Sequence, residues 1–216
     1  MPNPALPSTE SRWPAYILAG GQSSRFGSDK ARVEIAGRAN VVRLAEQLQT
    51  RGCAVALVAQ QTGDYADLGF RTLSDAIPNA GPLAGVITAL EDLRLQCNPP
   101  RDSDDRSPDA NAKCWILTCD LLGSDGSWMD RLMAEHLPTS LVTAYEDVSF
   151  RPFPAIYTLA MLPVAKRVWD EGGRSMRSAF SAAGPRVHWV PPRGNALPRS
   201  FNTPEELQRA LAELDS

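Results

Sequence analysis

The sequence has few of the residues that carry disulfide, zinc or thiol chemistry. Its 216 residues include only four cysteines and two histidines. The cysteines are Cys53, Cys97, Cys114 and Cys119, and because none of them forms a C-x-x-C pair, we expect no zinc site. We interpret them as the reduced thiols of a cytoplasmic protein. A nucleophilic role for Cys119, which lies next to Asp120, stays open at this stage.

Long apolar runs and an excess of positive charge are missing as well. No stretch approaches the roughly 20 apolar residues that a membrane helix needs. The formal net charge is −3 and the pI is near 5.5, so neither a nucleic acid nor an anionic membrane is an expected partner. Residues 1–12 hold three prolines and no apolar core, which argues against a signal peptide and predicts a disordered tail over residues 1–13.

The rest of the chain alternates strand-like apolar runs with helical patterns. This alternation predicts an α/β fold, and residues 14–216 fit a single domain. The expected strands are Ala15–Ala19, Ala54–Ala59, Arg71–Leu73, Cys114–Thr118, Ser140–Ala144 and Arg186–Val190. A polar, proline-containing segment at about residues 97–113 interrupts the pattern, and we expect it to be an exposed, mobile insertion.

Five helices are expected between and after these strands. Asn40 is predicted to cap the first, which Gly52 ends, and Pro82 is predicted to open the second. The third and fourth cover Trp128–His136 and Leu162–Glu171. Thr203 is predicted to cap the last helix, with Glu206 completing a capping box.

The segment from Tyr16 to Lys30 is the most informative part of the sequence. It reads Y-I-L-A-G-G-Q-S-S-R-F-G-S-D-K, so an apolar strand leads directly into a glycine- and serine-rich loop. Glycines allow close approach of the backbone to a ligand, and exposed N–H groups in such a loop bind anions. Arg25 and Lys30 add two positive charges suited to a polyphosphate. The segment matches neither the common phosphate loop nor the dinucleotide fingerprint.

Three further segments stand out beside this loop. Asp120 follows the strand that ends at Thr118, and the carboxyl ends of such strands line the ligand crevice. Asp75 also follows a predicted strand, and it precedes the G-P-L-A-G segment over 81–85. Asn202 precedes the Thr-Pro pair that starts the last helix.

Together these segments resemble the molybdenum cofactor guanylyltransferase branch of the nucleotidyltransferase superfamily, whose loop reads G-G-x-x-x-R-[MF]-G-x-x-K. The resemblance spans about residues 15 to 210. It implies a three-layer, Rossmann-like nucleotidyltransferase domain with a mostly parallel sheet. It further implies transfer of GMP from GTP to molybdenum-bound molybdopterin with release of pyrophosphate. Mg²⁺ is the implied cofactor, and molybdoenzymes or their chaperones are possible recipients of the product.

The same resemblance assigns roles to individual residues. Arg25, Lys30 and Asp120 are the expected catalytic residues, and Asp120 is the expected Mg²⁺ ligand. The expected nucleotide site comprises Leu18, Ala19, Gly20, Gly21, Lys30, Asp75 and Asp120, with Asp75 accepting hydrogen bonds from the guanine edge. Gln60 stands where some members have a nucleotide-binding asparagine. Arg151, Arg174 and Arg177 are candidates to face the pterin substrate, although a solvated surface explains Arg174 and Arg177 equally well.

Two other functions stay open on the sequence alone. The first is a cytidylyltransferase that acts on the same cofactor with CTP, although those enzymes tend to show A-A-G where this chain has Ala19-Gly20-Gly21. The second is a non-catalytic nucleotide- or cofactor-binding module. Release of pyrophosphate would separate either enzyme from such a module.

Overall fold

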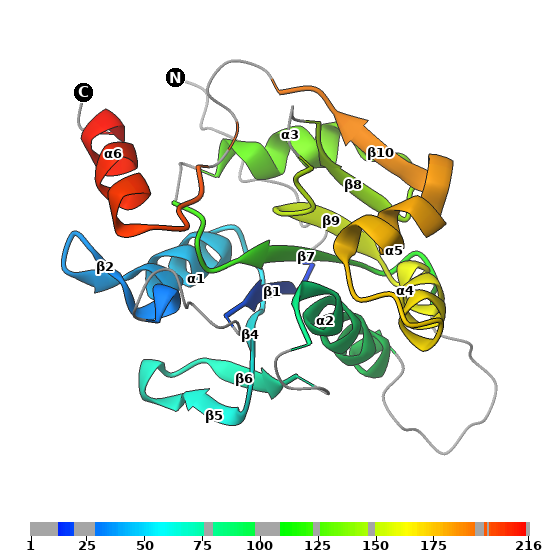
Figure 1. Cartoon of the computed structure of the whole chain (residues 1–216), viewed down its shortest axis with the longest axis horizontal. Coiled ribbons are helices and arrows are strands. Elements are labelled where there is room, and N and C mark those ends of the chain that lie inside the picture. The colour runs from blue at the N-terminus through cyan, green and yellow to red at the C-terminus, as the bar shows by residue number, and fades with distance from the viewer. Residues whose placement is uncertain are drawn as a thin grey trace, which may run out of the picture.

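The structure is a computed structural model that describes residues 13–19, 29–75, 80–97, 109–122, 126–146, 150–192, 197 and 199–214. Its centre is a seven-stranded sheet with the strand order β10-β8-β9-β7-β1-β4-β6 (Figure 1). The strands of this sheet are β1 (Ala15–Leu18), β4 (Val55–Ala59), β6 (Arg71–Ser74), β7 (Lys113–Thr118), β8 (Val142–Tyr145), β9 (Ala155–Thr158) and β10 (Val187–Val190).

The sheet is mostly parallel, as predicted. β1 pairs in parallel with β4 on one side and with β7 on the other, and β6 and β10 also pair in parallel with their neighbours. Only β9 runs antiparallel, between β7 and β8. The described remainder includes α1 (Asn40–Thr50), α2 (Pro82–Cys97), α3 (Ser127–Glu135), α4 (Met161–Asp170), α5 (Met176–Ala183), α6 (Pro204–Leu214), a two-stranded sheet of β2 (Glu34–Ile35) and β3 (Arg38–Ala39), strand β5 (Thr62–Tyr65), and the short 3₁₀ turns η1 (Lys30–Arg32), η2 (Ala66–Leu68) and η3 (Gly184–Arg186).

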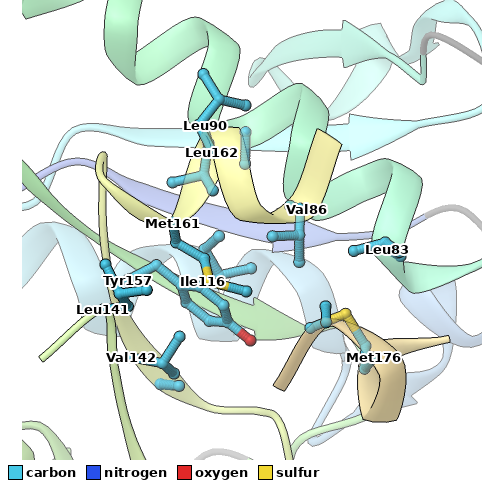
Figure 2. Packing of buried hydrophobic residues seen from close by; sticks show 14 of the residues in the cluster. Leu83, Val86, Leu90, Ile116, Leu141, Val142, Tyr157, Met161, Leu162 and Met176 are labelled. Atoms are coloured by element: carbon cyan, nitrogen blue, oxygen red, sulfur yellow. The ribbon is translucent and has the colours of Figure 1, made fainter. Parts of the chain in front are cut away.

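Helices cover both faces of the sheet, so alternate residues of each central strand enter two different cores. In β1, Tyr16 and Leu18 belong to the core that contains α2, α4 and α5, whereas Ala15 and Ile17 belong to the core beneath α1 and α3. Figure 2 shows the first core, where side chains of α2 and α4 meet those of the sheet strands and Met176 of α5. Burial of both faces explains why the strands read as unbroken apolar runs. The three-layer α/β prediction is therefore confirmed.

Helix α6 packs away from these two cores. Leu207 and Ala210 of α6 belong to a small buried cluster that also contains Ile35 of the β2–β3 hairpin, Phe201 and Leu122. The helix therefore lies beside β2 (Figure 1). Because Phe201 and Leu207 are both buried, the start of α6 is held in place by apolar contacts, and this places Asn202 next to a distant part of the chain.

Most of the predicted elements are confirmed with boundary shifts of one or two residues. Gly52, at a φ of 81°, follows the end of α1, and Pro82 is the first residue of α2. The prediction that Asn40 caps α1 is wrong, because Ala39 is the N-cap and Asn40 is the first helical residue. The β2–β3 hairpin and β5 were not predicted, because runs of two to four residues give too little periodicity.

Two predictions concern segments that the structure describes only at their edges. Trp13, which the sequence assigned to the tail, packs against Trp115 with ring centroids 5.7 Å apart. Residues 98–108 of the predicted insertion lie outside the described residues. At the edges of that segment, Cys97 belongs to α2 and Lys113 to β7. Among the described residues, no helix is long and apolar enough to cross a lipid bilayer.

Candidate active site

The candidate site lies where the order of the strands reverses. From β1 the chain proceeds outward through β4 to β6, and then crosses back over β1 to form β7 on its other side. In open α/β sheets, the carboxyl ends of the two strands at such a reversal flank the ligand crevice. Here these are the ends of β1 and β7, which lead to Ala19 and to Asp120.

Lys30 and Asn202 meet at this edge of the sheet. The Nζ of Lys30 donates a hydrogen bond of 3.0 Å to Oδ1 of Asn202. The chain after β7 explains why the two residues meet, because Leu121 and Ser200 form an antiparallel bridge and the N–H of Phe201 donates to the carbonyl of Asp120 at 3.1 Å. These backbone contacts bring the start of α6 to the carboxyl end of β7.

Asp120 occupies a turn directly after β7, and its side chain is poorly solvated. Burial raises the pKa of Asp120 above its ordinary value, whereas the hydroxyl of Thr118 and the positive charges of Lys30 and Arg151 oppose this rise. Its Oδ1 is buried and has no hydrogen-bond partner among the described residues. A desolvated carboxylate with an unpaired oxygen is costly unless a cation approaches it. The environment of Asp120 therefore suits a bound cation.

Asn40 holds the turn that carries Asp120. It is fully buried, and its Nδ2 donates to the carbonyl oxygens of Cys119 at 2.9 Å and of Leu121 at 2.7 Å. These two bonds fix the backbone on both sides of Asp120. Sequence reasoning assigned Asn40 to a helix cap and missed this role. Because a helix cap accounts for an asparagine at this position, the sequence offers no reason to expect a second role for Asn40.

The backbone at the end of β1 is largely occupied by contacts within the protein. The N–H of Ala19 donates to Val58, and the carbonyl of Leu18 accepts from the N–H of Cys119. The carbonyl of Ala19 accepts a hydrogen bond of 3.1 Å from the hydroxyl of Tyr65. A nucleotide could therefore pack against the backbone of Leu18 and Ala19, but it would not find a free N–H donor at Ala19. Tyr65 was not identified from the sequence.

Asp75 lies at the same edge of the sheet, after β6. Its Oδ1 accepts from the hydroxyl of Thr88 in α2 at 3.3 Å, and burial raises the pKa of Asp75 while this hydrogen bond opposes the rise. A Cβ on Gly85 would lie 3.1 Å from the side chain of Leu18 and 3.7 Å from Oδ1 of Asp75. Glycine at this position thus allows α2 to pack closely against the strand ends.

Asp75 and Asp120 are separated along the edge of the sheet. β6 and β7 are three strand spacings apart, which is about 14 Å. Gln60, directly after β4, and Ala19, directly after β1, lie between them in strand order. These residues are arranged to suit an elongated ligand, with one end near Asp75 and a charged end near Lys30 and Asp120.

The three arginines that were considered for the second substrate have different surroundings. The guanidinium of Arg174 stacks 3.9 Å from the ring centre of Trp169 and donates to the carbonyl of Trp169 at 2.6 Å. Arg177 lies over the ring of Phe150 at 4.6 Å. The positive charge of Arg151 opposes the rise in the pKa of Asp120. Arg151 therefore has the clearest link to the site.

Several candidates can be placed only in part. Gly20, Gly21 and Arg25 lie outside the described residues. Among the residues that are described, no group of three or more His, Cys, Asp or Glu side chains is arranged to hold a metal ion. Burial also raises the pKa of Cys119, and the nearby Asp120 and Asp29 raise it further. The thiol therefore stays protonated, which argues against a nucleophilic role.

A separate hollow of about 290 Å³ contains none of the predicted site residues. It lies between the β2–β3 hairpin and α1, and it is lined by Ile35, Ala36, Arg38, Arg43, Glu46, Gln47 and Thr50. The candidate site is consequently defined by the strand ends and not by this hollow.

Comparison with known proteins shows what the chain is similar to. The family described as the MobA-like NTP transferase domain matches residues 15–187. The chain is 31% identical to the molybdenum cofactor guanylyltransferase of Rhizobium meliloti, over 93% of this chain and 91% of that protein. It is 45% identical to a probable molybdenum cofactor guanylyltransferase of Deinococcus radiodurans, over 89% and 91% of the two chains. A crystal structure of molybdopterin-guanine dinucleotide biosynthesis protein A from Archaeoglobus fulgidus has the same fold, with a TM-score of 0.69, 16% identity, and coverage of 93% of this chain and 98% of that one.

Proposed function

Because the chain belongs to the MobA-like NTP transferase family, we propose that it transfers GMP from GTP to molybdenum-bound molybdopterin. The products are the guanine dinucleotide form of the cofactor and pyrophosphate. The observation that carries the proposal is the meeting of Lys30, Asn202 and Asp120 at the carboxyl ends of β1 and β7. This crevice is where a phosphate chain is bound in folds of this architecture.

The reaction needs little acid–base chemistry from the protein. An oxygen of the terminal phosphate of molybdopterin forms a bond to the α-phosphorus of GTP, and the bond from that phosphorus to the β-phosphate oxygen breaks. The pyrophosphate leaves with the electron pair. Because the attacking phosphate is already anionic, no general base is required. Catalysis then depends on alignment of the two substrates and on neutralisation of charge at the phosphates.

Lys30 has the position and chemistry to neutralise the charge on the leaving pyrophosphate. Its ammonium group is a compact point charge with three donors, and one of them is directed to Oδ1 of Asn202. That bond limits the range of the side chain and leaves two donors for phosphate oxygens. Asn202 is therefore a positioning residue for Lys30, and a fixed donor loses less entropy when the substrate binds.

The residues at Asp120 fit a Mg²⁺ ion that is bound together with the phosphates. The buried, unpartnered Oδ1 is the oxygen that would hold the ion, and Asn40 keeps the turn of Asp120 in place. Mg²⁺ is usually bound by one or two carboxylates together with substrate phosphates and waters, so Asp120 can hold the ion without a larger cluster of protein ligands. When bound, the ion neutralises phosphate charge that would otherwise oppose the approach of a second anion.

Asp75 is the proposed recognition residue for the base. An ionised carboxylate accepts two hydrogen bonds from the adjacent N–H groups of guanine, whereas cytosine presents no such pair. The separation of about 14 Å between the strands that carry Asp75 and Asp120 leaves room for the ribose and phosphates.

A cytoplasmic location and delivery of the product to molybdoenzymes or their chaperones belong to the same proposal. The four unpaired cysteines of the chain are consistent with that location.

A reconstituted reaction tests the proposal. Purified protein, Mg²⁺ and molybdenum-bound molybdopterin are mixed with GTP or CTP, and pyrophosphate and the dinucleotide product are quantified by enzyme-coupled assay and mass spectrometry. We expect product with GTP and little with CTP. Product with CTP alone would assign the chain to the cytidylyl reaction, and nucleotide binding without pyrophosphate release would indicate a non-catalytic module.

A further inference from the structure

Tyr65, at the end of β5, connects the end of β1 with the turn that carries Lys30. It is buried, and its hydroxyl donates to the carbonyl of Ala19. Its pKa is raised by burial and next by the neighbouring carboxylate of Asp29. Asp29 is the N-cap of η1 and accepts a hydrogen bond from the N–H of Ala31. One phenol group therefore lies between Ala19 and Asp29, the described residues on either side of the glycine-rich segment.

A second contact joins the same two regions. Arg32, in the turn η1 that begins with Lys30, donates two hydrogen bonds of 2.7 Å to the two carboxylate oxygens of Asp67 in η2. The Arg32 guanidinium also lies 5.1 Å from the ring centre of Tyr65. Two-point pairing between an arginine and a carboxylate fixes orientation as well as distance. The turn of Lys30 is thus held against β5 and η2 at two places.

The segment of β5 that carries Tyr65 is itself hydrogen-bonded to the main sheet. Thr72 of β6 donates from its hydroxyl to the carbonyl of Asp64 at 2.8 Å, directly before Tyr65. Tyr65 adopts a left-handed conformation with a φ of 63°. That conformation is strained for a tyrosine and is kept only where the surroundings require it. In this conformation the hydroxyl of Tyr65 reaches the carbonyl of Ala19 at the end of β1.

We propose that Tyr65, with the Arg32–Asp67 pair, is a positioning unit that sets the location of Lys30 relative to the end of β1. Lys30 is two residues from Arg32 in the same turn, and its ammonium group donates a hydrogen bond to Asn202. The unit therefore controls the backbone of Lys30, whereas Asn202 controls the end of its side chain. None of the three residues of the unit needs to touch the substrate. The inference rests on the proposed role of Lys30 at the phosphates.

The two parts of the unit differ in how they act. The Tyr65 hydroxyl makes its hydrogen bond in a buried place, where loss of the donor leaves the carbonyl of Ala19 unsatisfied. The side chains of Arg32 and Asp67 are 43% and 60% exposed, so water and salt screen their attraction. Tyr65 should therefore dominate, and the ion pair should make a smaller, salt-sensitive contribution.

Tyr145 provides a matched control for Tyr65. It is also a buried tyrosine, and its hydroxyl donates to the backbone carbonyl of Trp128 at 3.0 Å. That bond joins β8 to α3, and β8 lies toward the opposite edge of the sheet from β6, the strand that β5 contacts. Tyr65→Phe and Tyr145→Phe thus remove the same chemical group from similar surroundings. Both should lower the melting temperature by a similar amount, so that any difference between them at the site reports position and not stability.

The test measures binding of inorganic pyrophosphate with Mg²⁺ by calorimetry, together with kcat and KM for GTP. Tyr65→Phe should weaken pyrophosphate binding about tenfold, which corresponds to about 1.4 kcal/mol, and should lower kcat more than it raises KM. Tyr145→Phe should bind pyrophosphate as the wild type does. In the Lys30→Ala background, Tyr65→Phe should cause no further loss, because it acts through Lys30.

The remaining outcomes also decide the matter. Equal pyrophosphate affinity of Tyr65→Phe and Tyr145→Phe, or full additivity of the Tyr65 and Lys30 variants, would overturn the positioning unit. Asp67→Asn should show a smaller loss than Tyr65→Phe, and its difference from the wild type should disappear at high salt. If pyrophosphate binds as described but GTP is not turned over, the proposed reaction fails while the positioning unit stands, because the binding measurement does not depend on catalysis.

Discussion

Lys30 and Asn202 are 172 residues apart in the sequence, yet their side chains are joined by a hydrogen bond of 3.0 Å. The first begins the short turn that follows the glycine-rich segment, and the second precedes the last helix. The bond links an early segment of the chain to the start of its last helix, at the carboxyl ends of β1 and β7. It gives the proposed phosphate-binding charge a fixed position before substrate arrives.

Neighbouring residues at the start of α6 should separate function from stability. The Thr203 hydroxyl accepts from the N–H of Glu206 at 3.2 Å and caps the helix, so Thr203→Ala should lower the free energy of unfolding by about 1 kcal/mol and leave kcat unchanged. Asn202→Ala should leave stability nearly unchanged and lower kcat about tenfold, because Lys30 loses its partner. Urea unfolding and pyrophosphate release measure the two effects. The same response in both variants would contradict the assignment of Asn202.

Lys30→Ala should remove the charge without disturbing the fold. We expect a loss of turnover of about 10² or more, as for other charges that act on a transition state. Lys166 provides the control, since it is an exposed lysine paired with Glu91 at 2.8 Å, and Lys166→Ala should keep both activity and stability. Turnover near the wild-type level in a folded Lys30→Ala protein would remove Lys30 from the mechanism.

Asp120→Asn tests whether this carboxylate holds the metal ion. The change keeps the size of the side chain but removes a desolvated charge, so the metal-free variant should be at least as stable as the wild type. It should need far more Mg²⁺ for half-maximal rate, and the residual rate should be lower by about 10² or more. A Mg²⁺ titration of pyrophosphate release gives both quantities. Superimposable titrations of wild type and variant would show that Asp120 is only a turn residue.

Asp75 should give binding and stability opposite responses to pH. Burial raises the pKa of Asp75 above its ordinary value of 3.8, so the folded protein holds this proton more tightly than the unfolded chain does. The stability from this proton is fully present below pH 3.8 and is lost as the pH rises through the folded pKa. Recognition of guanine needs the ionised carboxylate and should therefore improve over the same rise in pH.

The variant Asp75→Asn separates these two effects. The gain in unfolding free energy of the variant over the wild type should be larger at pH 7 than at pH 3.5. At pH 7 the wild type carries the cost of the buried charge, and the variant does not. Its affinity for guanosine should lose the pH dependence of the wild type, and it should prefer guanosine over inosine less strongly. Guanosine is the suitable probe because it carries no phosphate and needs no metal. An unchanged preference would argue that Asp75 does not contact the base.

Much of the fold could be predicted from the sequence because its signals are local. Strands that are buried on both faces must be apolar along their length, which marked β1, β4 and β7 in the sequence. Gly52, Pro82 and Thr203 stand at helix ends for reasons that involve only adjacent residues. The positions of Lys30, Asp75 and Asp120 after strands placed them at one edge of a parallel sheet before any contact was known.

The contacts that make these residues a site were decided by the tertiary structure. Asn40 looks like a helix cap in the sequence, and only the packing of α1 against the end of β7 shows that it holds the turn of Asp120. Tyr65 stands in a strand of four residues with no distinctive pattern, yet it reaches the carbonyl of Ala19, 46 residues away. Such pairs depend on the order of strands in the sheet. That order is set by the burial of both faces over the whole chain and leaves no local trace in the sequence.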